Sequence, residues 1–346
     1  MTDTLKVGVI GAGYWGPNLI RNFNDAPGAD VLAVADLQPQ RLAPIQKRYP
    51  SIQMTTDHRS ILDDPKVEAV AIATPISTHR PLCEEAFAAG KHVLVEKPLA
   101  GTVADAEAIV AAARAARRTL MVGHTFVHNP AVSAVRGIIE RGDLGEIHYI
   151  DSQRVNLGLH QFDFNVLWDL GPHDVSITLY WLDQEPLWVQ CVGGCYVQDD
   201  IEDVAWLTIG FPSGAIAHAH LSWLAPGKIR TMTVIGSRKM AMYDDLMPVE
   251  KVKIFDQGVE RLDPDELRRA YRAGDIHSPR VPMTEALQIE VTRFVESVRT
   301  GTPSISDGEA GLRVVRVLEA ASRSLRAKGA RVEYAPRREA VATAVR

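Results

Sequence analysis

The sequence predicts an α/β domain built on a doubly wound parallel sheet, followed by an α+β domain built on an open antiparallel sheet with helices. Up to about residue 123, short β-branched runs alternate with helical patterns, which is typical of a parallel sheet with helices on both faces. After that point, strand-like runs follow one another through short turns, which indicates antiparallel pairing. The 346 residues suffice for two domains and are too many for one simple core.

The strands expected in the first half are near-continuous apolar runs, as strands buried on both faces require. They cover residues 6–10, 30–36, 67–74, 91–97 and 119–123. Helices are expected at residues 81–90, where Gly90 provides a stop, and at the Ala-rich residues 102–118.

The second half opens with an expected helix at residues 129–142, a strand at 146–155 and a helical stretch at 165–183. Strands are then expected at residues 187–197, 202–211, 214–223, 229–236, 239–245 and 251–257. Two late helices, at residues 284–301 and 306–329, close this half. The tail after Tyr334 is expected to be unpacked.

Composition excludes several classes of protein. The formal charge of −5 argues against a nucleic acid as the main partner, because phosphate backbones select dense basic patches. Three cysteines do not make a disulfide framework and indicate a reducing compartment. No targeting or membrane-spanning segment is visible, so a cytoplasmic enzyme or binding protein is expected. The histidine pairs at 124/128 and 218/220 lack a third ligand, so no metal site is predicted.

The first strand runs directly into GAGYWG, residues 11–16. Gly11, Gly13 and Gly16 match the G-x-G-x-x-G pattern with a strand before and a helix after, and Asp36 ends the second strand. In this context the glycines allow a tight turn around a pyrophosphate, and the acid binds the adenosine ribose. The pattern predicts a Rossmann domain that binds a dinucleotide, with Tyr14 and Trp15 in the same loop.

The choice of dinucleotide depends on Asp36. Its carboxylate repels a 2′-phosphate, and Leu37 and Gln38 supply no positive charge for one. Arg41 is near enough in sequence to leave NADP open. NAD is therefore predicted as the cofactor, with NADP the less favoured alternative.

Two further loops leave the carboxyl ends of the predicted parallel strands, where ligands of such sheets bind. One loop carries Thr74, Pro75 and His79, and the other carries Glu96 and Lys97. We expect these residues to line the cofactor crevice. The alternatives are that Lys97 is an ordinary solvated lysine and that His79 only begins a helix.

Residues 165–177, NVLWDLGPHDVSI, combine an apolar helical pattern with Asp169 and His173. Gly171-Pro172 should interrupt or distort the helix between them. A helical course would still place the two side chains approximately on one face, four residues apart. A carboxylate beside an imidazole orients the ring and stabilises its protonated form. The alternative is that His173 caps a helix and Asp169 is its partner.

These motifs together resemble the glucose–fructose oxidoreductase/inositol dehydrogenase family, Gfo/Idh/MocA. The resemblance rests on GAGYWG, the second-strand Asp, ATPxxxH, EKP, GHTFVHNP and the D-x-x-x-H of WDLGPHD, and it covers nearly the whole chain. Within the family, NVLWDLGPHDVSI, SWLAPGKIR and YDDLMPVEKVKIFDQGVE look most like nucleotide-sugar members, notably UDP-N-acetylglucosaminuronate 3-dehydrogenases and sugar 3-ketoreductases.

The resemblance implies a catalytic trio of Lys97, Asp169 and His173, and a cis bond between Lys97 and Pro98. It implies NAD-dependent hydride transfer from a secondary alcohol of a sugar, with a nucleotide-linked sugar and its C3 as the expected substrate. His173 would remove the hydroxyl proton while Lys97 holds the developing alkoxide. The same three residues would contact the substrate.

A further group of polar residues could bind an anionic part of the substrate. Arg154 with Asn156, and Lys228 with Arg230, are two residues apart and should each share one face of a strand. They could hold a diphosphate or a carboxylate, and a solvated face is the equal alternative. The long antiparallel sheet predicts self-association into a homodimer or homotetramer.

We therefore expect residues 1–123 to form the dinucleotide-binding domain and residues 124–335 to form a substrate-binding and oligomerisation domain, with 336–346 as a flexible tail. Three alternatives remain open for the function. The first is an NADPH-dependent 3-keto-sugar reductase, and the second is a dehydrogenase of inositol or a free sugar. The third is a catalytically silent NAD-binding regulatory protein, against which the intact acid–base residues count.

Overall fold

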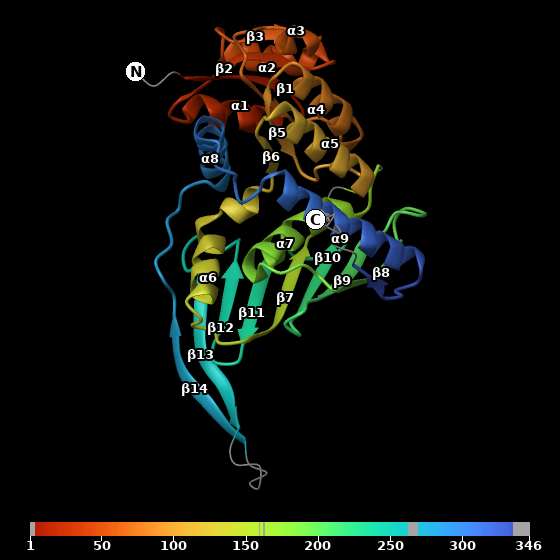
Figure 1. Ribbon diagram of the computed structural model, residues 1–346. Helices are drawn as coiled ribbons and strands as arrows, with labels where there is room; N and C mark the ends of the chain where they lie inside the picture. Colours follow the sequence, from red (N-terminus) through yellow and green to blue (C-terminus); the bar gives the residue numbers. More distant parts are fainter. Residues whose placement is uncertain (1–3, 159, 162, 262–268, 335–346) are drawn as a thin grey trace, which may run out of the picture.

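Two sheets organise the chain: a parallel one from its first third, and a larger, mostly antiparallel one from the rest (Figure 1). The structure, a computed structural model, describes residues 4–158, 160–161, 163–261 and 269–334. The predicted fold class is confirmed. Within these ranges, no helix combines the length and apolar character needed to cross a membrane. The predicted tail at 336–346 lies outside the described residues.

The first sheet has the strand order β3-β2-β1-β4-β5-β6, and all its neighbouring strands are parallel. The strands are β1 (Leu5–Ile10), β2 (Ala29–Ala35), β3 (Gln53–Thr55), β4 (Ala69–Ile72), β5 (His92–Glu96) and β6 (Leu120–Gly123). The order reverses between β1 and β4, which creates a ligand-binding crevice at the carboxyl ends of these strands. Of these six strands, only the short β3 was not predicted from the sequence pattern.

Helices cover both faces of this sheet. They are α1 (Gly16–Asp25), α2 (Pro39–Arg48), α3 (Arg59–Leu62), α4 (His79–Ala88) and α5 (Val103–Ala116), with a 3-10 turn, η1 (Ile76–Thr78). The expected helices at 81–90 and 102–118 are confirmed as α4 and α5. Thr102 caps α5 by accepting a hydrogen bond from the backbone N–H of Asp105 (3.1 Å).

The second sheet has the order β14-β13-β12-β11-β7-β10-β9-β8-β15. Its strands are β7 (Ile147–Val155), β8 (Trp188–Gly194), β9 (Val204–Gly210), β10 (Ile216–Ser222), β11 (Ile229–Gly236), β12 (Met240–Asp244), β13 (Val252–Arg261), β14 (Arg269–His277) and β15 (Val332–Glu333). One pair, β7 and β10, is parallel, so uniform antiparallel pairing was wrong. The reason is that α7 carries the chain from central β7 to the far strand β8, and two hairpins then return it to β7.

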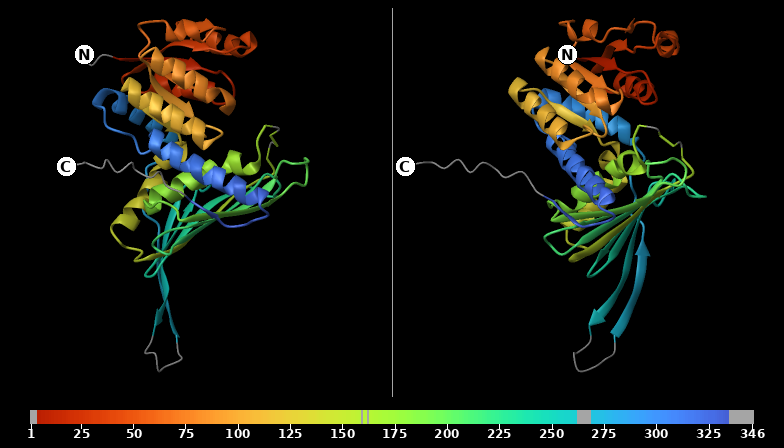
Figure 2. Two further views of the ribbon diagram at one scale, coloured as in Figure 1. Left: turned by 45° about the vertical axis from the view of Figure 1, so that its right-hand side comes forward. Right: turned by 90° about the vertical axis from the view of Figure 1, so that its right-hand side faces the viewer.

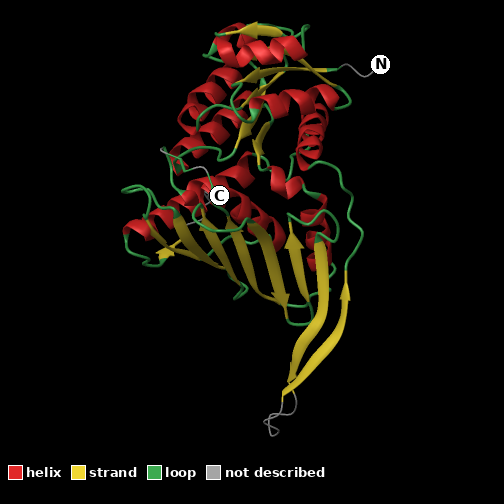
Figure 3. Ribbon diagram, turned by 180° about the vertical axis from the view of Figure 1, so that it is seen from behind, coloured by secondary structure: helices red, strands yellow, loops and turns green. Residues whose placement is uncertain are grey.

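Helices pack on one face of the second sheet and leave the other face open (Figure 2). They are α6 (Pro130–Glu140), α7 (Val166–Leu182) and α9 (Gly308–Arg326), preceded by a 3-10 turn, η2 (Thr125–His128). Seen from behind, this helical layer lies between the two sheets (Figure 3). The arrangement places α7 against the carboxyl edge of the first sheet.

Helix α7 runs unbroken through Gly171-Pro172, so the predicted interruption was wrong. Gly171 is buried, and a Cβ there would lie 3.2–3.4 Å from side-chain carbons of Leu167, Leu221 and Leu318. Close packing therefore explains this glycine. Because the helix is continuous, Asp169 and His173 are one turn apart on one face, as their spacing predicts.

Helix α8 (Ala286–Thr300) packs on the first sheet rather than the second. Its Phe294 meets Phe23 of α1 with ring centroids 6.1 Å apart. The division of the chain after Gly123 thus separates the sheets but not all of the helices. The apolar face of α8, which includes Leu287 and Val291, explains this placement.

Candidate active site and cofactor crevice

The glycine loop has the shape that a dinucleotide requires. Gly11 has φ +99°, and a Cβ there would lie 2.5 Å from the carbonyl oxygen of Ala73. A Cβ on Gly16 would lie 2.3 Å from the carbonyl oxygen of Gly11. Gly13 is open instead, with only the Arg41 guanidinium 3.8 Å away. The loop is therefore tight where helix and strand meet and accessible where a pyrophosphate would approach.

Asp36 is bound into this loop. Its Oδ2 accepts a hydrogen bond from the backbone N–H of Ala12 (2.7 Å), and its Oδ1 accepts one from Gln38 (2.8 Å). Arg41 Nη1 lies 3.6 Å from Oδ2. The carboxylate lies where an adenosine ribose would bind. It also partly neutralises the charge of Arg41, the residue that could have bound the 2′-phosphate of NADP. Tyr14 and Trp15 of this loop are exposed, with ring centroids 5.5 Å apart.

The loop after β4 is closed by its histidine. His79 is 1% exposed, and its ring nitrogens lie within 3.0 Å of the carbonyl oxygens of Thr74 and Pro98. The ring therefore links two loops, and a contact between His79 and the cofactor stays a prediction. Thr74 hydrogen-bonds the Thr78 hydroxyl (2.7 Å), and Pro75 precedes η1 at the edge of the crevice.

Lys97 joins the two halves of the site. It follows β5, and its bond to Pro98 is cis, as the resemblance implied. Its Nζ donates to the backbone oxygen of Asp169 (2.8 Å) and lies 3.5 Å from the Asp169 Oδ1. The side chain is only 13% exposed. The solvated-lysine alternative is therefore wrong.

Asp169 contacts the side chain of Lys97 rather than the imidazole of His173. Its Oδ2 accepts a hydrogen bond from the indole Nε1 of Trp223 (2.9 Å). No hydrogen bond joins Asp169 to His173 among the described residues, so the predicted carboxylate–imidazole pair is absent. The one-turn separation places both groups on one face but does not bring them into contact. Trp223 was not singled out, although it lies in SWLAPGKIR.

His173 lies edge-on to Phe126, with ring centroids 4.7 Å apart. Its Nδ1 is buried without a hydrogen-bond partner in the described part of the chain. Burial holds the pKa of His173 well below its ordinary value, and the positive charge of Lys97 lowers it further. The ring is therefore neutral at pH 7, and a neutral imidazole has one acceptor nitrogen.

Arg154 is buried (3% exposed) against the same aromatic ring. Its Nε and Nη2 donate to the carboxylate of Asp174 (3.0 and 3.1 Å), and its guanidinium lies 4.5 Å from the Phe126 centroid. A solvated face is therefore wrong for this arginine. Its Nη1 is buried and has no hydrogen-bond partner among the described residues. A buried donor of this kind is suited to an anionic ligand.

The other three residues of this group differ in position. Arg230 is directly opposite Arg154 in the β11–β7 register and forms an ion pair with Asp245 (3.4 Å). Asn156 lies one residue beyond the end of β7, and Lys228 lies one residue before β11 and is exposed. The fold therefore brings Arg154 and Arg230 together near His173 and leaves Lys228 at the surface.

Two acidic side chains are buried at the EKP segment, and one of them is its own glutamate. Burial raises the pKa of Glu96 to about 7, and its carboxylate lies over Gly123, where a Cβ would be 3.1 Å from Oε2. Glu290 of α8 accepts a hydrogen bond from Thr125 (2.7 Å), and burial together with Glu96 raises its pKa well above the usual range. Glu290 lies nearly two hundred residues away in sequence, so no motif pointed to it.

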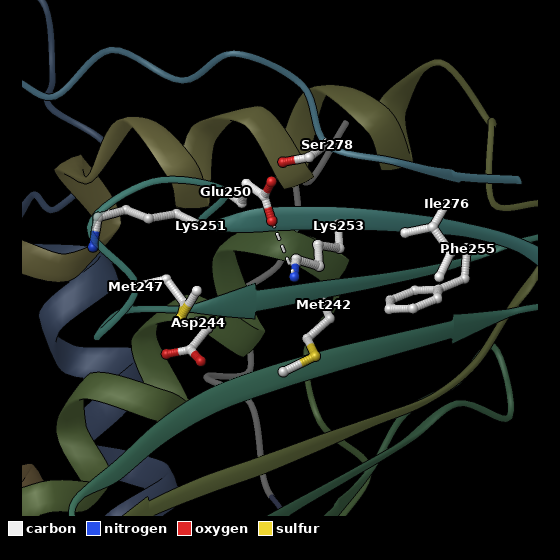
Figure 4. Close-up of a pocket in the computed structure, with 9 residues that line it drawn as sticks. All are labelled: Met242, Asp244, Met247, Glu250, Lys251, Lys253, Phe255, Ile276 and Ser278. Carbon is white, nitrogen blue, oxygen red and sulfur yellow. Dashed lines mark ion pairs between the residues drawn. The ribbon is translucent and has the colours of Figure 1, made fainter.

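A separate recess of about 410 Å³ lies on the open face of the second sheet, among β12, β13 and β14 (Figure 4). It contains the Glu250–Lys253 ion pair (3.2 Å) and none of the predicted site residues. In the described part of the chain, no group of three or more His, Cys, Asp or Glu side chains is arranged to hold a metal ion.

Two family models match the two halves of the chain. The oxidoreductase family model described as an NAD-binding Rossmann fold matches residues 5–124, and the Gfo/Idh/MocA C-terminal domain matches residues 132–242. The chain belongs to the Gfo/Idh/MocA family. It is therefore an oxidoreductase with NAD as its cofactor, and the predictions of family and cofactor are confirmed.

Individual relatives match over nearly the full length. UDP-N-acetylglucosamine 3-dehydrogenase of Acidithiobacillus ferrooxidans is 27% identical, over 90% of this chain and 94% of that protein. Myo-inositol 2-dehydrogenase of Thermotoga maritima is 24% identical, over 94% and 97%. Among solved structures, that of an oxidoreductase from Magnetospirillum magnetotacticum MS-1 has a TM-score of 0.80. Its sequence is 34% identical, and the match covers 92% of this chain and 100% of that one.

Proposed function

We propose that this Gfo/Idh/MocA oxidoreductase oxidises a secondary alcohol of a sugar, with a nucleotide-linked sugar as the substrate and C3 as the oxidised carbon. One observation carries the proposal. Nζ of Lys97 lies 3.5 Å from Oδ1 of Asp169, and Asp169 is one helical turn from a neutral His173. A lysine and an unprotonated imidazole at the edge of an NAD crevice suit alcohol oxidation. The relative that acts on UDP-N-acetylglucosamine supports the choice of sugar.

The side chains divide the work of the reaction. Bound NAD supplies the hydride acceptor, and the glycine loop and Asp36 would hold its pyrophosphate and ribose. His173 accepts the hydroxyl proton, because its neutral ring has an acceptor nitrogen. Lys97 stabilises the alkoxide as charge develops on oxygen. Asp169 positions Lys97 by binding its ammonium group through both backbone and side-chain oxygens.

An anionic part of the substrate would be held on the sheet side of His173. Arg154 offers a buried Nη1 that no described residue pairs, and Arg230 lies opposite Arg154 in the register. Their acidic partners, Asp174 and Asp245, fix both guanidinium groups in place. We propose that these two arginines bind a carboxylate or phosphate, with Asn156 and Lys228 as further contacts at the rim.

A substrate screen tests the proposal. The purified protein is mixed with NAD and, separately, with UDP-N-acetylglucosamine, its uronate, myo-inositol and glucose, and absorbance of reduced cofactor is followed. We expect reduction with a nucleotide sugar, no reduction by the Lys97→Ala variant, and a 3-keto product located by borodeuteride trapping and mass spectrometry. Turnover of myo-inositol or glucose alone would reject the nucleotide-linked substrate. Binding of NAD without any turnover would favour the silent regulatory alternative.

A further inference from the structure

A recess of about 260 Å³ lies behind the catalytic candidates, among η2, α6, α7 and α9. Helices α7 and α9, two of its walls, pack against each other (Figure 1). At its inner end is His124, which is 1% exposed. At its outer end are Ile305, 47% exposed, and Asp183, whose side chain is 72% exposed. The recess therefore extends from the surface to a buried imidazole.

Three imidazole nitrogens at this place have no hydrogen-bond partner in the described part of the chain. Both ring nitrogens of His124 and the Nδ1 of His173 are buried and unpaired among the described residues. Buried polar groups are nearly always paired with protein or with ordered water. The recess is far larger than the roughly 15 Å³ that one water needs. His124 lines the recess, so water is the partner that the geometry allows for its nitrogens.

The two imidazoles also lie close to the reacting groups. Burial lowers the pKa of His124 to about 3, and the charge of Lys97 contributes. Lys97 and His124 both contribute to the low pKa of His173. Ser176, which lines the recess, donates to the backbone oxygen of His173 (2.8 Å). A neutral imidazole has one donor and one acceptor nitrogen, so it can receive a proton on one side and release one on the other.

We propose that His124 and water in this recess carry the reaction's proton from His173 to solvent. The inference rests on the proposed function. When the alcohol becomes a ketone, one hydrogen and two electrons leave as hydride to NAD, and the hydroxyl proton remains on His173. Since substrate and dinucleotide would fill the crevice in front of His173, the path runs on the opposite side. It passes from Nδ1 of His173 through water to His124 and then along the recess.

A crystal structure gives the first test. We expect ordered water hydrogen-bonded to a ring nitrogen of His124, continued by further water toward Asp183. A dry recess would overturn the inference whatever substrate the enzyme accepts. This arm needs no turnover, so it is independent of the proposed function.

Stopped-flow kinetics gives the second test. With enzyme in excess, formation of reduced cofactor is followed by absorbance and proton release by an indicator dye in weak buffer. In the wild type we expect both signals at the same rate. In His124→Leu the proton signal should lag about tenfold or more, and added imidazole should shorten the lag. Ala310→Phe, which fills the recess without altering His124, should reproduce the lag, whereas Arg323→Phe on the exposed side of α9 should not.

The outcomes separate the two proposals. Turnover with no lag in either His124→Leu or Ala310→Phe overturns the proton path alone. Absence of turnover in the wild type overturns the proposed function, and the proton path with it. Unchanged NAD affinity in the variants shows that a lag is not caused by loss of the fold.

Discussion

At the scale of single residues, cations surround the imidazole of the site. Lys97, Arg154 and Arg230 all contribute to the low pKa of His173, after the larger effect of burial. The carboxylates of Asp169, Asp174 and Asp245 are each engaged with one of these cations instead of the ring. The site is thus arranged to keep a base unprotonated and to stabilise negative charge on a substrate.

Replacement of His173 is the first prediction. His173→Ala should lower kcat by about 10²–10⁴-fold, because a positioned base contributes that much, while NAD affinity stays unchanged. Asp169→Asn should have a smaller effect, because its backbone oxygen still binds Lys97. Steady-state kinetics with the identified substrate, and NAD titration, measure both. Near-normal turnover in His173→Ala would leave Lys97 as the acid–base group.

The pH profile of the same enzyme is the second prediction. The base works when neutral and its pKa is lowered, so activity should fall only well below pH 6.5. Arg230→Gln removes a positive charge near the ring, so the acid limb of kcat/KM should move to higher pH. The exposed Arg293→Gln serves as the control and should leave the limb in place. A shift in the opposite direction would contradict the electrostatic account.

Asp36 provides the third prediction. Asp36→Ala removes an acid that binds the glycine loop through Ala12 and repels a 2′-phosphate. NAD should bind more weakly and NADP more tightly, by roughly tenfold each, since one charge-assisted hydrogen bond contributes about 1.5–3 kcal/mol. Fluorescence titration with both dinucleotides measures the change. Tighter binding of NADP than NAD to the wild type would show that this acid does not set the preference.

At the scale of elements, α7 carries both Asp169 and His173, so the way this helix begins sets the position of both side chains. Asn165 caps the helix, accepting from the N–H of Trp168 (3.3 Å), and its Nδ2 donates to Glu202 before β9 (2.6 Å). One side chain therefore fixes the start of α7 to the sheet.

The fourth prediction concerns this cap. Asn165→Ala should lower the free energy of unfolding by about 1 kcal/mol, measured by urea titration. It should also lower kcat several-fold, because the turn that holds Lys97 becomes less ordered. Thr102→Ala removes an equivalent cap on α5, a helix that carries none of the site residues. It should cost similar stability and leave kcat unchanged. If kcat is equal in both variants, the Asn165 cap has no effect on catalysis.

At the scale of the whole molecule, the second sheet has one face on which no described helix packs (Figure 2). Tyr149, Trp206 and Ile216 are 38–47% exposed there, although the residue that follows each of them is buried on the opposite face. The ribbon β13–β14 extends beyond the body of the protein (Figure 1), and Tyr271 on it is 82% exposed. Two-stranded ribbons are marginally stable alone. We propose that this face binds a second copy of the chain.

Self-association is the fifth prediction. Light scattering after gel filtration should give a dimer or tetramer for the wild type. Ile216→Arg should shift it toward monomer, because a charge in an apolar interface loses its hydration. Leu37→Arg, an equally apolar but distant exposed position, should have no effect on the oligomer. A monomeric wild type at micromolar concentration would contradict the proposal.

Local patterns were enough for much of this protein. The apolar runs predicted five of the six parallel strands because those strands are buried on both faces, so nearly every side chain is apolar. The glycine loop was readable because its pattern stands directly between a strand and a helix, and because Gly16 packs on Gly11 of the same loop. Spacing alone also placed Asp169 and His173 on one face of a helix.

The partners of those residues were decided only by the tertiary structure. Asp169 binds Lys97 and Trp223, which lie 72 and 54 residues away in sequence. Arg154 is buried against Asp174 because β7 passes under α7, and α8 returns to the first sheet because its apolar face fits α1. Sequence determines which groups are available and how each short segment folds. Long-range packing determines which charges meet, because that depends on the path of the whole chain.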